Sequence, residues 1–227
     1  MEVKNLLIQS ENFLLGGDEA VESLSEKDSA SIAIVSDSHG SSADLLSMVK
    51  NAGACDALFF CGDGISDLSS LVGTALRSTE LQSLMPPVIA FVQGNNDLAN
   101  FVLKNPETGA LVNVKVPSEA CVKVAGHKIL LTHGHKFGIY AGLDGLRRAA
   151  RLLGMDVVLF GHTHIASYSS DEGLLLLNPG SIALPRENQP KCYAKMYLER
   201  GKPASDFAFF QLKGNGDAPF KTPVLLG

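Results

Sequence analysis

Five short apolar runs in this sequence each end in a cluster of aspartate, asparagine or histidine. The clusters are Ser-Asp-Ser-His-Gly at 36–40, Cys-Gly-Asp-Gly at 61–64, Gly-Asn-Asn-Asp at 94–97, Thr-His-Gly-His at 132–135 and Gly-His-Thr-His at 161–164. Any one of them is typical of a turn, because glycine, asparagine and aspartate are common turn residues. In open α/β sheets, however, ligands bind outside the carboxyl ends of the strands. Five such ends therefore predict one polar site at one edge of the fold.

The first half of the chain alternates between apolar runs and helical patterns. We predict strands at 31–36, 57–62 and 88–92, separated by helices at 43–53 and 67–84. Asp67 is the candidate N-cap of the second helix. Three strands joined by two helices form a βαβαβ unit, which predicts a parallel sheet with right-handed crossovers.

The second half is richer in strands, and it sets the domain boundaries. The predicted elements are a strand at 111–116, two strands within 121–134 joined by Gly126 and His127, a helix at 144–154, and strands at 156–161, 174–180, 193–199 and 207–212. We divide the chain into an N-terminal extension (1–30), a catalytic domain (31–213) and a C-terminal tail (214–227). The extension is expected either to pack on the domain or to lie at the interface of a homo-oligomer.

Composition narrows the class of protein. A chain of 227 residues with 45% hydrophobic residues can bury a large core. Its net charge of −5 offers no basic field for nucleic acid. The four cysteines form no C-x-x-C pair, which predicts reduced thiols and a cytoplasmic protein. No apolar run reaches about 18 residues and the start lacks a signal-peptide pattern, so no membrane association is expected.

The side chains in the five clusters are ligands for divalent metal ions. The candidate metal ligands are Asp37, His39, Asp63, Asn95, His133, His162 and His164. They include no thiolate, and mixed nitrogen and oxygen ligands suit manganese, iron, nickel, cobalt or zinc. Seven ligands are too many for one tetrahedral ion and suit two ions about 3.5–4 Å apart. Five of the six histidines lie in the five clusters. The other one, His127, lies in a predicted hairpin turn and is interpreted as structural.

As an ordered set, these motifs resemble those of the calcineurin-like metallophosphoesterases, and most of all the small prokaryotic phosphodiesterase branch. The segment Leu-Asn-Pro-Gly-Ser at 177–181 also resembles that branch, and the resemblance covers residues 31–200. It implies a four-layer α/β/β/α sandwich of two packed mixed sheets. It also implies a phosphodiesterase that hydrolyses small phosphate esters by in-line attack of a hydroxide bridging two metal ions. Manganese is the expected metal.

The resemblance also implies a role for each ligand. One ion would be held by Asp37, His39, Asp63 and His164, and the other by Asp63, Asn95, His133 and His162. Asp63 would bridge them.

One position departs from the family pattern. Many relatives carry a histidine that assists the leaving group where this chain has Asn96. An amide donates a hydrogen bond but transfers no proton near neutral pH. Asp97 is expected to orient a histidine, as an acid there does in relatives, and His135 to contact the substrate phosphate or line the metal pocket. The predicted catalytic residues are therefore Asp63, Asn96, Asp97 and His135, and the substrate-binding residues Asn95 and His135.

Several alternatives stay open from the sequence. The retromer subunit of eukaryotes shares this fold as a protein-binding scaffold, but both His162 and His164 are present here, which favours an active site. A DNA nuclease ranks third, since the chain has no basic field. Arg147, Arg148 and Arg151 form either a solvated helix face or a phosphate-steering patch, and Ser181 either bonds near the site or begins a turn. The segments 67–85 and 98–118 are the expected walls of the substrate site.

Overall fold

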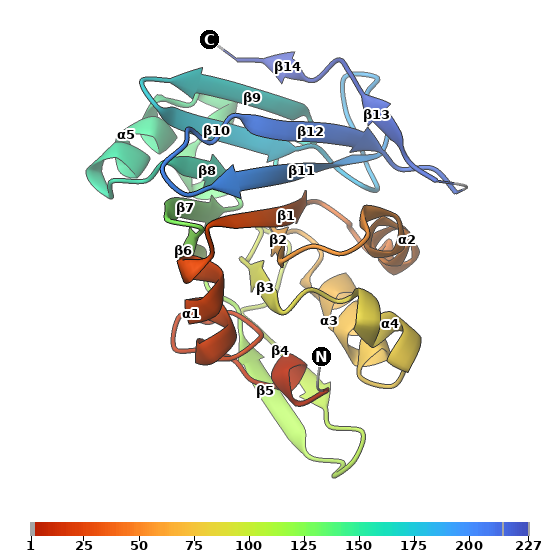
Figure 1. The fold of residues 1–227 in the computed structure, drawn as a ribbon. Coiled ribbons are helices and arrows are strands. Elements are labelled where there is room, and N and C mark those ends of the chain that lie inside the picture. Colours follow the sequence, from red (N-terminus) through yellow and green to blue (C-terminus); the bar gives the residue numbers. More distant parts are fainter. Residues whose placement is uncertain (1–2, 215, 227) are drawn as a thin grey trace.

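The computed structural model describes residues 3–214 and 216–226, so four residues of the predicted extension and tail (1, 2, 215 and 227) lie outside the described part. The described chain forms two six-stranded sheets that pack face to face (Figure 1). The first sheet has the order β13 (Ala218–Phe220), β12 (Asp206–Gln211), β11 (Cys192–Glu199), β1 (Ser29–Val35), β2 (Ala57–Phe60), β3 (Val88–Phe91). The second has the order β14 (Val224–Leu225), β9 (Ala166–Asp171), β10 (Leu174–Pro179), β8 (Val157–Leu159), β7 (His127–Thr132), β6 (Glu119–Val124).

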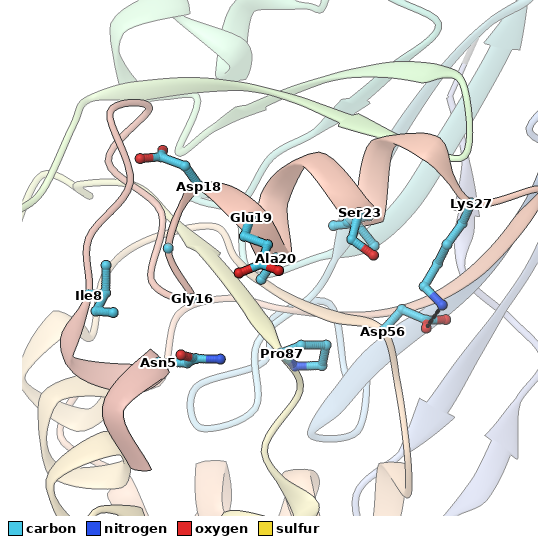
Figure 2. A pocket seen from close by; sticks show the side chains of 12 residues that line it. Asn5, Ile8, Gly16, Asp18, Glu19, Ala20, Ser23, Lys27, Asp56 and Pro87 are labelled. Atoms are coloured by element: carbon cyan, nitrogen blue, oxygen red, sulfur yellow. Dashed lines mark ion pairs between the residues drawn. The ribbon is translucent and has the colours of Figure 1, made fainter. Parts of the chain in front are cut away.

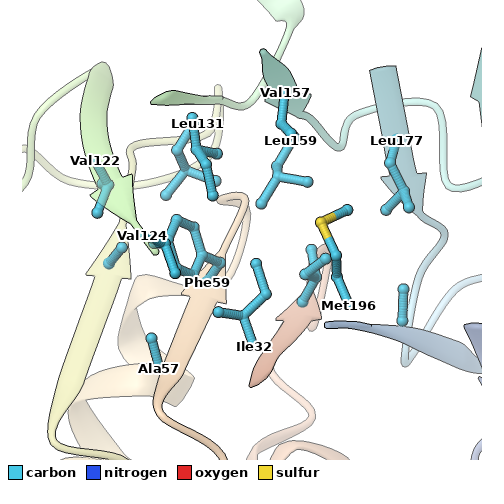
Figure 3. Close-up of a cluster of buried hydrophobic side chains, with 14 of the residues drawn as sticks. Ile32, Ala57, Phe59, Val122, Val124, Leu131, Val157, Leu159, Leu177 and Met196 are labelled. Atoms are coloured by element: carbon cyan, nitrogen blue, oxygen red, sulfur yellow. The ribbon is translucent and has the colours of Figure 1, made fainter. Parts of the chain in front are cut away.

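A shared apolar layer joins the two sheets. Figure 3 shows Ile32 and Phe59 of the first sheet facing Leu131 and Leu159 of the second. The strands β1, β2 and β3 are buried on their second face too, against other apolar residues. Burial on both faces explains why these strands appear in the sequence as continuous apolar runs.

Helices cover the outer face of each sheet. The apolar sides of α2 (Ser42–Ala52), α3 (Ile65–Ala75) and α4 (Thr79–Leu84) pack on the first sheet, and α5 (Asp144–Leu152) packs on the second. Figure 1 shows α5 and the other three helices on opposite sides of the paired sheets. The predicted four-layer α/β/β/α sandwich is therefore confirmed.

The strand ends are level with one another. In the parallel pairs of the first sheet, Val35 is the partner of Phe60 and Phe60 is the partner of Phe91. In the second sheet Leu131 is the partner of Leu159, also in parallel. This register brings the polar residues that follow each strand to a common edge.

The two chain ends are built into the sandwich. The residues from Val3 to Leu7 form a 3-10 helix, and α1 (Asp18–Glu26) follows it. Leu14 and Leu24 are fully buried in the layer between the sheets. At the other end, β13 pairs with β12 and β14 with β9. The domain boundaries predicted from the sequence remain a prediction.

Three local predictions differ from the structure. The predicted helix 67–84 is two helices, because the chain leaves helical geometry before Ser78, which caps α4 by accepting a hydrogen bond from the backbone N–H of Leu81 at 3.2 Å. Asp67 lies inside α3 rather than at its N-cap. The hairpin turn is Ala125–Gly126, and His127 begins β7. The described residues contain no helix long and apolar enough to cross a membrane.

The sequence also missed a hairpin and several strands. The segment 98–118 forms a separate hairpin of β4 (Asn100–Lys104) and β5 (Leu111–Lys115), of which only the second strand was predicted. Also missed were β9, which carries several serines and an aspartate rather than an apolar run, and the short strands β13 and β14 within the predicted tail.

Candidate metal centre

Five of the predicted ligands have a backbone conformation that is uncommon for residues with a side chain. Their φ angles lie between 41° and 70°, in the left-handed region, and the residues are Asp37, His39, Asp63, His162 and His164. Such strained residues cluster at functional sites, where the surrounding structure holds them in place. The strain turns these side chains toward one another just beyond the strand ends.

Two glycines allow the loops to approach closely. A Cβ atom on Gly94 would overlap the Asp63 carboxylate, and one on Gly161 would overlap the Ser36 hydroxyl and lie 2.9 Å from Asp37 Oδ2. Neither position tolerates a larger residue without moving a predicted ligand. The glycines of the motifs are therefore explained by packing against the site.

Asp37 lies at the centre of the cluster. Its side chain is fully buried, and its Oδ1 atom accepts no hydrogen bond from the described residues. The Nε2 atoms of His164, His39 and His133 lie 3.2, 3.7 and 4.0 Å from this oxygen. A buried carboxylate oxygen without a hydrogen bond is costly, and a bound cation would satisfy it.

Asp63 lies between the two sides of the cluster. Its Oδ2 atom is 3.7 Å from His39 Nε2 and 3.4 Å from His133 Nε2. Two groups of side chains could each hold an ion, Asp37 with His39 and His164, and Asp37 with Asp63 and His133. The ligand atoms of each group lie within 4.8 Å of one another. Asp37 is thus common to both groups, while the sequence predicted Asp63 as the bridge.

Backbone carbonyls orient two of the histidines. His133 Nδ1 lies 2.8 Å from the carbonyl oxygen of Cys61, and His164 Nδ1 lies 2.7 Å from that of Leu184. A protonated Nδ1 donates to each carbonyl and leaves the Nε2 lone pair directed at the carboxylates. This arrangement is the usual support of a metal-binding histidine.

The electrostatics keep both carboxylates ionised. Burial raises the pKa of Asp37, but the nearby imidazoles of His164, His39 and His133 outweigh it, and the pKa is lowered. Burial likewise raises the pKa of Asp63, but the hydrogen bonds of His133 and Asn96 outweigh it, and this pKa is lowered too. Both carboxylates are therefore available to bind a cation.

Asn96 and Asp97 hold the loops rather than extend into the site. Asn96 donates to both carboxylate oxygens of Asp63, from its backbone N–H at 2.9 Å and from its side-chain amide at 2.7 Å. Asp97 accepts four backbone N–H groups, those of Asp63, Gly64, Ile65 and Gly94, at 2.7–2.9 Å. Asp97 was predicted to orient a histidine. In the structure its carboxylate holds the backbone around Asp63 instead, so the predicted partner is wrong.

The remaining predicted residues line the rim of the cluster. Asn95 Oδ1 lies 3.2 Å from His133 Nε2. The rings of His135 and His162 lie 5.4 and 5.0 Å from the ring of His133, centroid to centroid. His135 Nδ1 is buried and has no hydrogen-bond partner among the described residues. Burial and the neighbouring His133 lower the pKa of both rim histidines, which favours neutral imidazoles.

Sequence reasoning missed several residues that support the site. Asp67 accepts hydrogen bonds from the Ser38 hydroxyl and the Gly40 backbone, at 2.5 and 2.9 Å. Asn178 donates to the carbonyl of Gly161 at 2.8 Å. Ser181 donates to the carbonyl of Asp37 at 2.7 Å and accepts from the N–H groups of Ala183 and Leu184, so it both bonds near the site and begins a turn. The supporting role of Asp67 is visible only from its contacts with residues far away in the sequence. Polar residues are common in the first turn of a helix, so the sequence gives no signal for this role.

Two other candidates lie outside the cluster. His127 is buried beside β11, with its Nε2 atom 3.0 Å from the carbonyl of Glu199, which confirms a structural role. In the basic helix, Arg147 donates to Ser169 at 2.7 Å and Arg151 pairs with Asp171 at 2.7 Å. These contacts favour a structural helix face over phosphate steering.

A cleft of about 460 Å³ lies beside α1, apart from the metal ligands. Figure 2 shows its polar lining, which includes Asp18 and Glu19 at the start of α1 and the ion pair of Lys27 with Asp56 at 3.2 Å. None of the predicted ligands lines this cleft.

Comparison with known proteins identifies the family. The sequence model of the calcineurin-like phosphoesterase superfamily domain matches residues 31–201. The chain is 33% identical over 187 residues to the protein named "Probable metallophosphoesterase YsnB" of Bacillus subtilis (strain 168). This alignment covers 81% of this chain and 92% of that protein. It is also 32% identical over 69 residues to Phosphodiesterase YfcE of Escherichia coli (strain K12). These aligned residues make up 30% of this chain and 34% of that protein.

A solved structure shows the same fold. Vacuolar Protein Sorting 29 from Cryptosporidium parvum superposes with a TM-score of 0.60 at 21% identity, covering 86% of this chain and 98% of that one. At this identity the likeness concerns the fold alone. The family match spans all five motifs. This chain is a member of the calcineurin-like phosphoesterase superfamily.

Proposed function

We propose that the protein is a phosphodiesterase that hydrolyses small phosphate esters with two divalent metal ions, manganese being the expected metal. The buried Oδ1 atom of Asp37 carries this proposal, because it has no hydrogen bond and three imidazole Nε2 atoms lie within 4.0 Å of it. Such a buried oxygen is costly unless a cation satisfies it, which supports a metal-dependent activity. The name of the related YfcE supports the phosphodiesterase class.

The donor set fits two ions. Asp37, His39, Asp63 and His164 would hold one, and Asp63, Asn95, His133 and His162 the other. Asp63 is proposed to serve both because its Oδ2 atom lies 3.7 Å from His39 Nε2 and 3.4 Å from His133 Nε2. Two such ions lower the pKa of a water molecule and neutralise the charge that grows on the phosphoryl oxygens. Four free cysteines are consistent with the proposed cytoplasmic location.

Asn96 and His135 have different proposed roles beside the metal ions. Asn96 holds Asp63 through two hydrogen bonds and offers no proton to a leaving group. His135 is the side chain proposed to contact the substrate phosphate, because its buried Nδ1 atom has no described partner and its ring lies beside His133.

Metal content and turnover test this proposal together. We expect about two manganese ions per chain, and metal-dependent hydrolysis of bis(p-nitrophenyl) phosphate. Replacing Asp37 with Asn should abolish both, since it removes a buried negative charge whose oxygen lies within 4.0 Å of three imidazole Nε2 atoms. The matched control is Asp171→Asn on the exposed end of β9, which should change neither. A wild-type protein without bound metal and without turnover would favour the scaffold function instead.

A further inference from the structure

Tyr140 and Arg186 form a linked pair at the rim of the candidate metal centre. The ring of Tyr140 lies 5.0 Å from the ring of His162, centroid to centroid. Arg186 Nη1 donates to the Tyr140 hydroxyl oxygen at 2.7 Å. Neither side chain belongs to the five motifs, and the proposed hydrolysis does not require either.

Two hydrogen bonds fix the ring of Tyr140. Its hydroxyl donates to the carbonyl oxygen of His162 at 3.0 Å and accepts from Arg186. The side chain is nevertheless 62% exposed. Holding an exposed tyrosine in one rotamer costs conformational entropy. Because the two hydrogen bonds already hold this ring before a ligand binds, it is a preorganised aromatic wall.

The loop that carries Arg186 is also fixed. The backbone N–H of Arg186 donates to the carbonyl of His164 at 3.1 Å. Gln189 ties the loop to Ala166 through both its side-chain atoms, at 2.6 and 3.1 Å. The base of the Arg186 side chain is therefore held beside a predicted metal ligand.

The charge of Arg186 is not neutralised by the protein. Within residues 3–214 and 216–226, no carboxylate forms a salt bridge with it. The contrast is Arg151, which pairs with Asp171 at 2.7 Å and Glu172 at 3.0 Å. A guanidinium carries five N–H donors in a planar fork that suits phosphate oxygens, and the bond to Tyr140 uses one of them.

We propose that Tyr140 and Arg186 form a subsite for a second phosphate group, so that the preferred substrates are phosphate esters with another phosphate on the part that projects past His162. This inference rests on the proposed function. The ring of Tyr140 would lie along the organic part of the substrate, and the fork of Arg186 would hold the distal phosphate. Loops around the site carry this specificity, as is usual for enzymes.

Ligand binding without turnover tests the subsite. The probes are AMP and the adenosine bisphosphate with phosphates on its 3′ and 5′ oxygens, titrated calorimetrically into the manganese-loaded protein. We expect the bisphosphate to bind roughly tenfold more tightly, which is the scale of a hydrogen bond between charged groups. In Arg186→Gln this ratio of affinities should fall toward one. Arg148→Gln is the matched control, because Arg148 is an exposed arginine on α5 and should keep the wild-type ratio.

A second variant separates the ring from its hydroxyl. Tyr140→Phe keeps the aromatic wall but releases Arg186, so the ratio should fall part of the way. A wild-type ratio near one, a wild-type ratio retained in Arg186→Gln, or failure of both ligands to bind would each overturn the subsite. If the ratio is present but no phosphodiester is hydrolysed, the proposed function fails and the subsite stands as a phosphate-binding site.

Discussion

The carboxylate of Asp97 shows how a single residue can shape the site without entering it. It accepts four backbone N–H groups from the loops after β2 and β3. One of these belongs to Asp63 and two to Gly64 and Ile65, at the start of α3. Asp97 thus joins a predicted metal ligand to a helix N-terminus, where a negative charge is favourable.

Replacing Asp97 with Asn should therefore destabilise the protein. An amide presents one oxygen and one NH₂ group, so two of the four N–H donors would face a donor instead of an acceptor. We expect the free energy of unfolding in urea to fall by about 2 kcal/mol. The control is Asp171→Asn, which removes an exposed ion pair with Arg151 and should cost less than about 1 kcal/mol. Equal losses in the two variants would contradict the capping role.

Asp63 and Asn96 should differ in what their loss does to catalysis. Asp63→Asn removes a charge from the proposed ion sites, whereas Asn96→Ala removes one hydrogen bond at 2.7 Å and leaves the backbone N–H donor at 2.9 Å in place. We expect Asp63→Asn to remove bound metal and nearly all turnover. Asn96→Ala should keep its metal and lose on the order of tenfold in kcat. Metal analysis and the turnover of a chromogenic diester measure the two effects. A greater loss of metal or turnover in Asn96→Ala than in Asp63→Asn would contradict these roles.

Because Asn96 transfers no proton, the rate should depend on the leaving group. We expect kcat for aryl phosphodiesters to fall as the pKa of the leaving phenol rises, with chemistry shown to limit the rate. A series of substituted phenyl esters provides the measurement. Rates that do not vary across the series would mean that another residue protonates the leaving group.

At the residue scale, the sequence indicated which side chains cluster at the strand ends better than it indicated the residues that support them. His39 and His162 were predicted because their residue type and position after a strand carry the signal. Asp97 and Asp67 were assigned other roles, since the Asp63 N–H that bonds Asp97 and the Ser38 hydroxyl that bonds Asp67 lie 34 and 29 residues away in sequence. Such bonds depend on how two loops meet, which spacing alone does not encode.

At the scale of elements, the N-terminal segment holds the β4–β5 hairpin. Gln9 Nε2 donates to the carbonyl of Lys115 at 2.7 Å, and the N–H of Lys115 donates back to Gln9 Oε1 at 3.0 Å. The side-chain amide thus pairs with β5 as another strand would. Figure 1 shows the hairpin beside the N-terminal segment, away from the paired sheets.

Removing this clamp should loosen the hairpin locally. In Gln9→Ala we expect the amide hydrogen of Lys115 to exchange roughly tenfold faster, because the bond to Gln9 Oε1 is lost. Exchange in β1 should be unchanged, since that strand lies within the first sheet. Gln82→Ala on α4 is the matched control and should leave the exchange of Lys115 as it is. Uniform acceleration across the chain would indicate global destabilisation instead.

Elements with a strong apolar pattern were the ones predicted correctly. The stripe of Leu45, Met48 and Val49 identified α2, and all three are buried. β4 was missed because it buries only alternate residues beside a polar loop. The break between α3 and α4 was missed because Arg77 and Ser78 interrupt the helix without a glycine or proline.

At the scale of the whole molecule, the two sheets share one core and should unfold together. The layer between them contains residues from both sheets and from the N-terminal segment. Because β1 lies between β11 and β2, the first sheet is complete only when strands from both halves of the chain have joined it. The sequence predicted this sandwich only through the resemblance to a family, since apolar runs do not say which strands pair.

The cooperativity can be tested at Phe59, whose fully buried side chain lies in the layer between the sheets (Figure 3). Phe59→Ala would leave a cavity against both sheets, so we expect the free energy of unfolding to fall by about 3–5 kcal/mol. Leu152→Ala is the control, because that side chain is 83% exposed and should change stability by less than about 0.5 kcal/mol. Urea unfolding followed by far-ultraviolet circular dichroism and by tyrosine fluorescence should give coincident transitions in both variants. Separate transitions in Phe59→Ala would show that one sheet stays folded without the other.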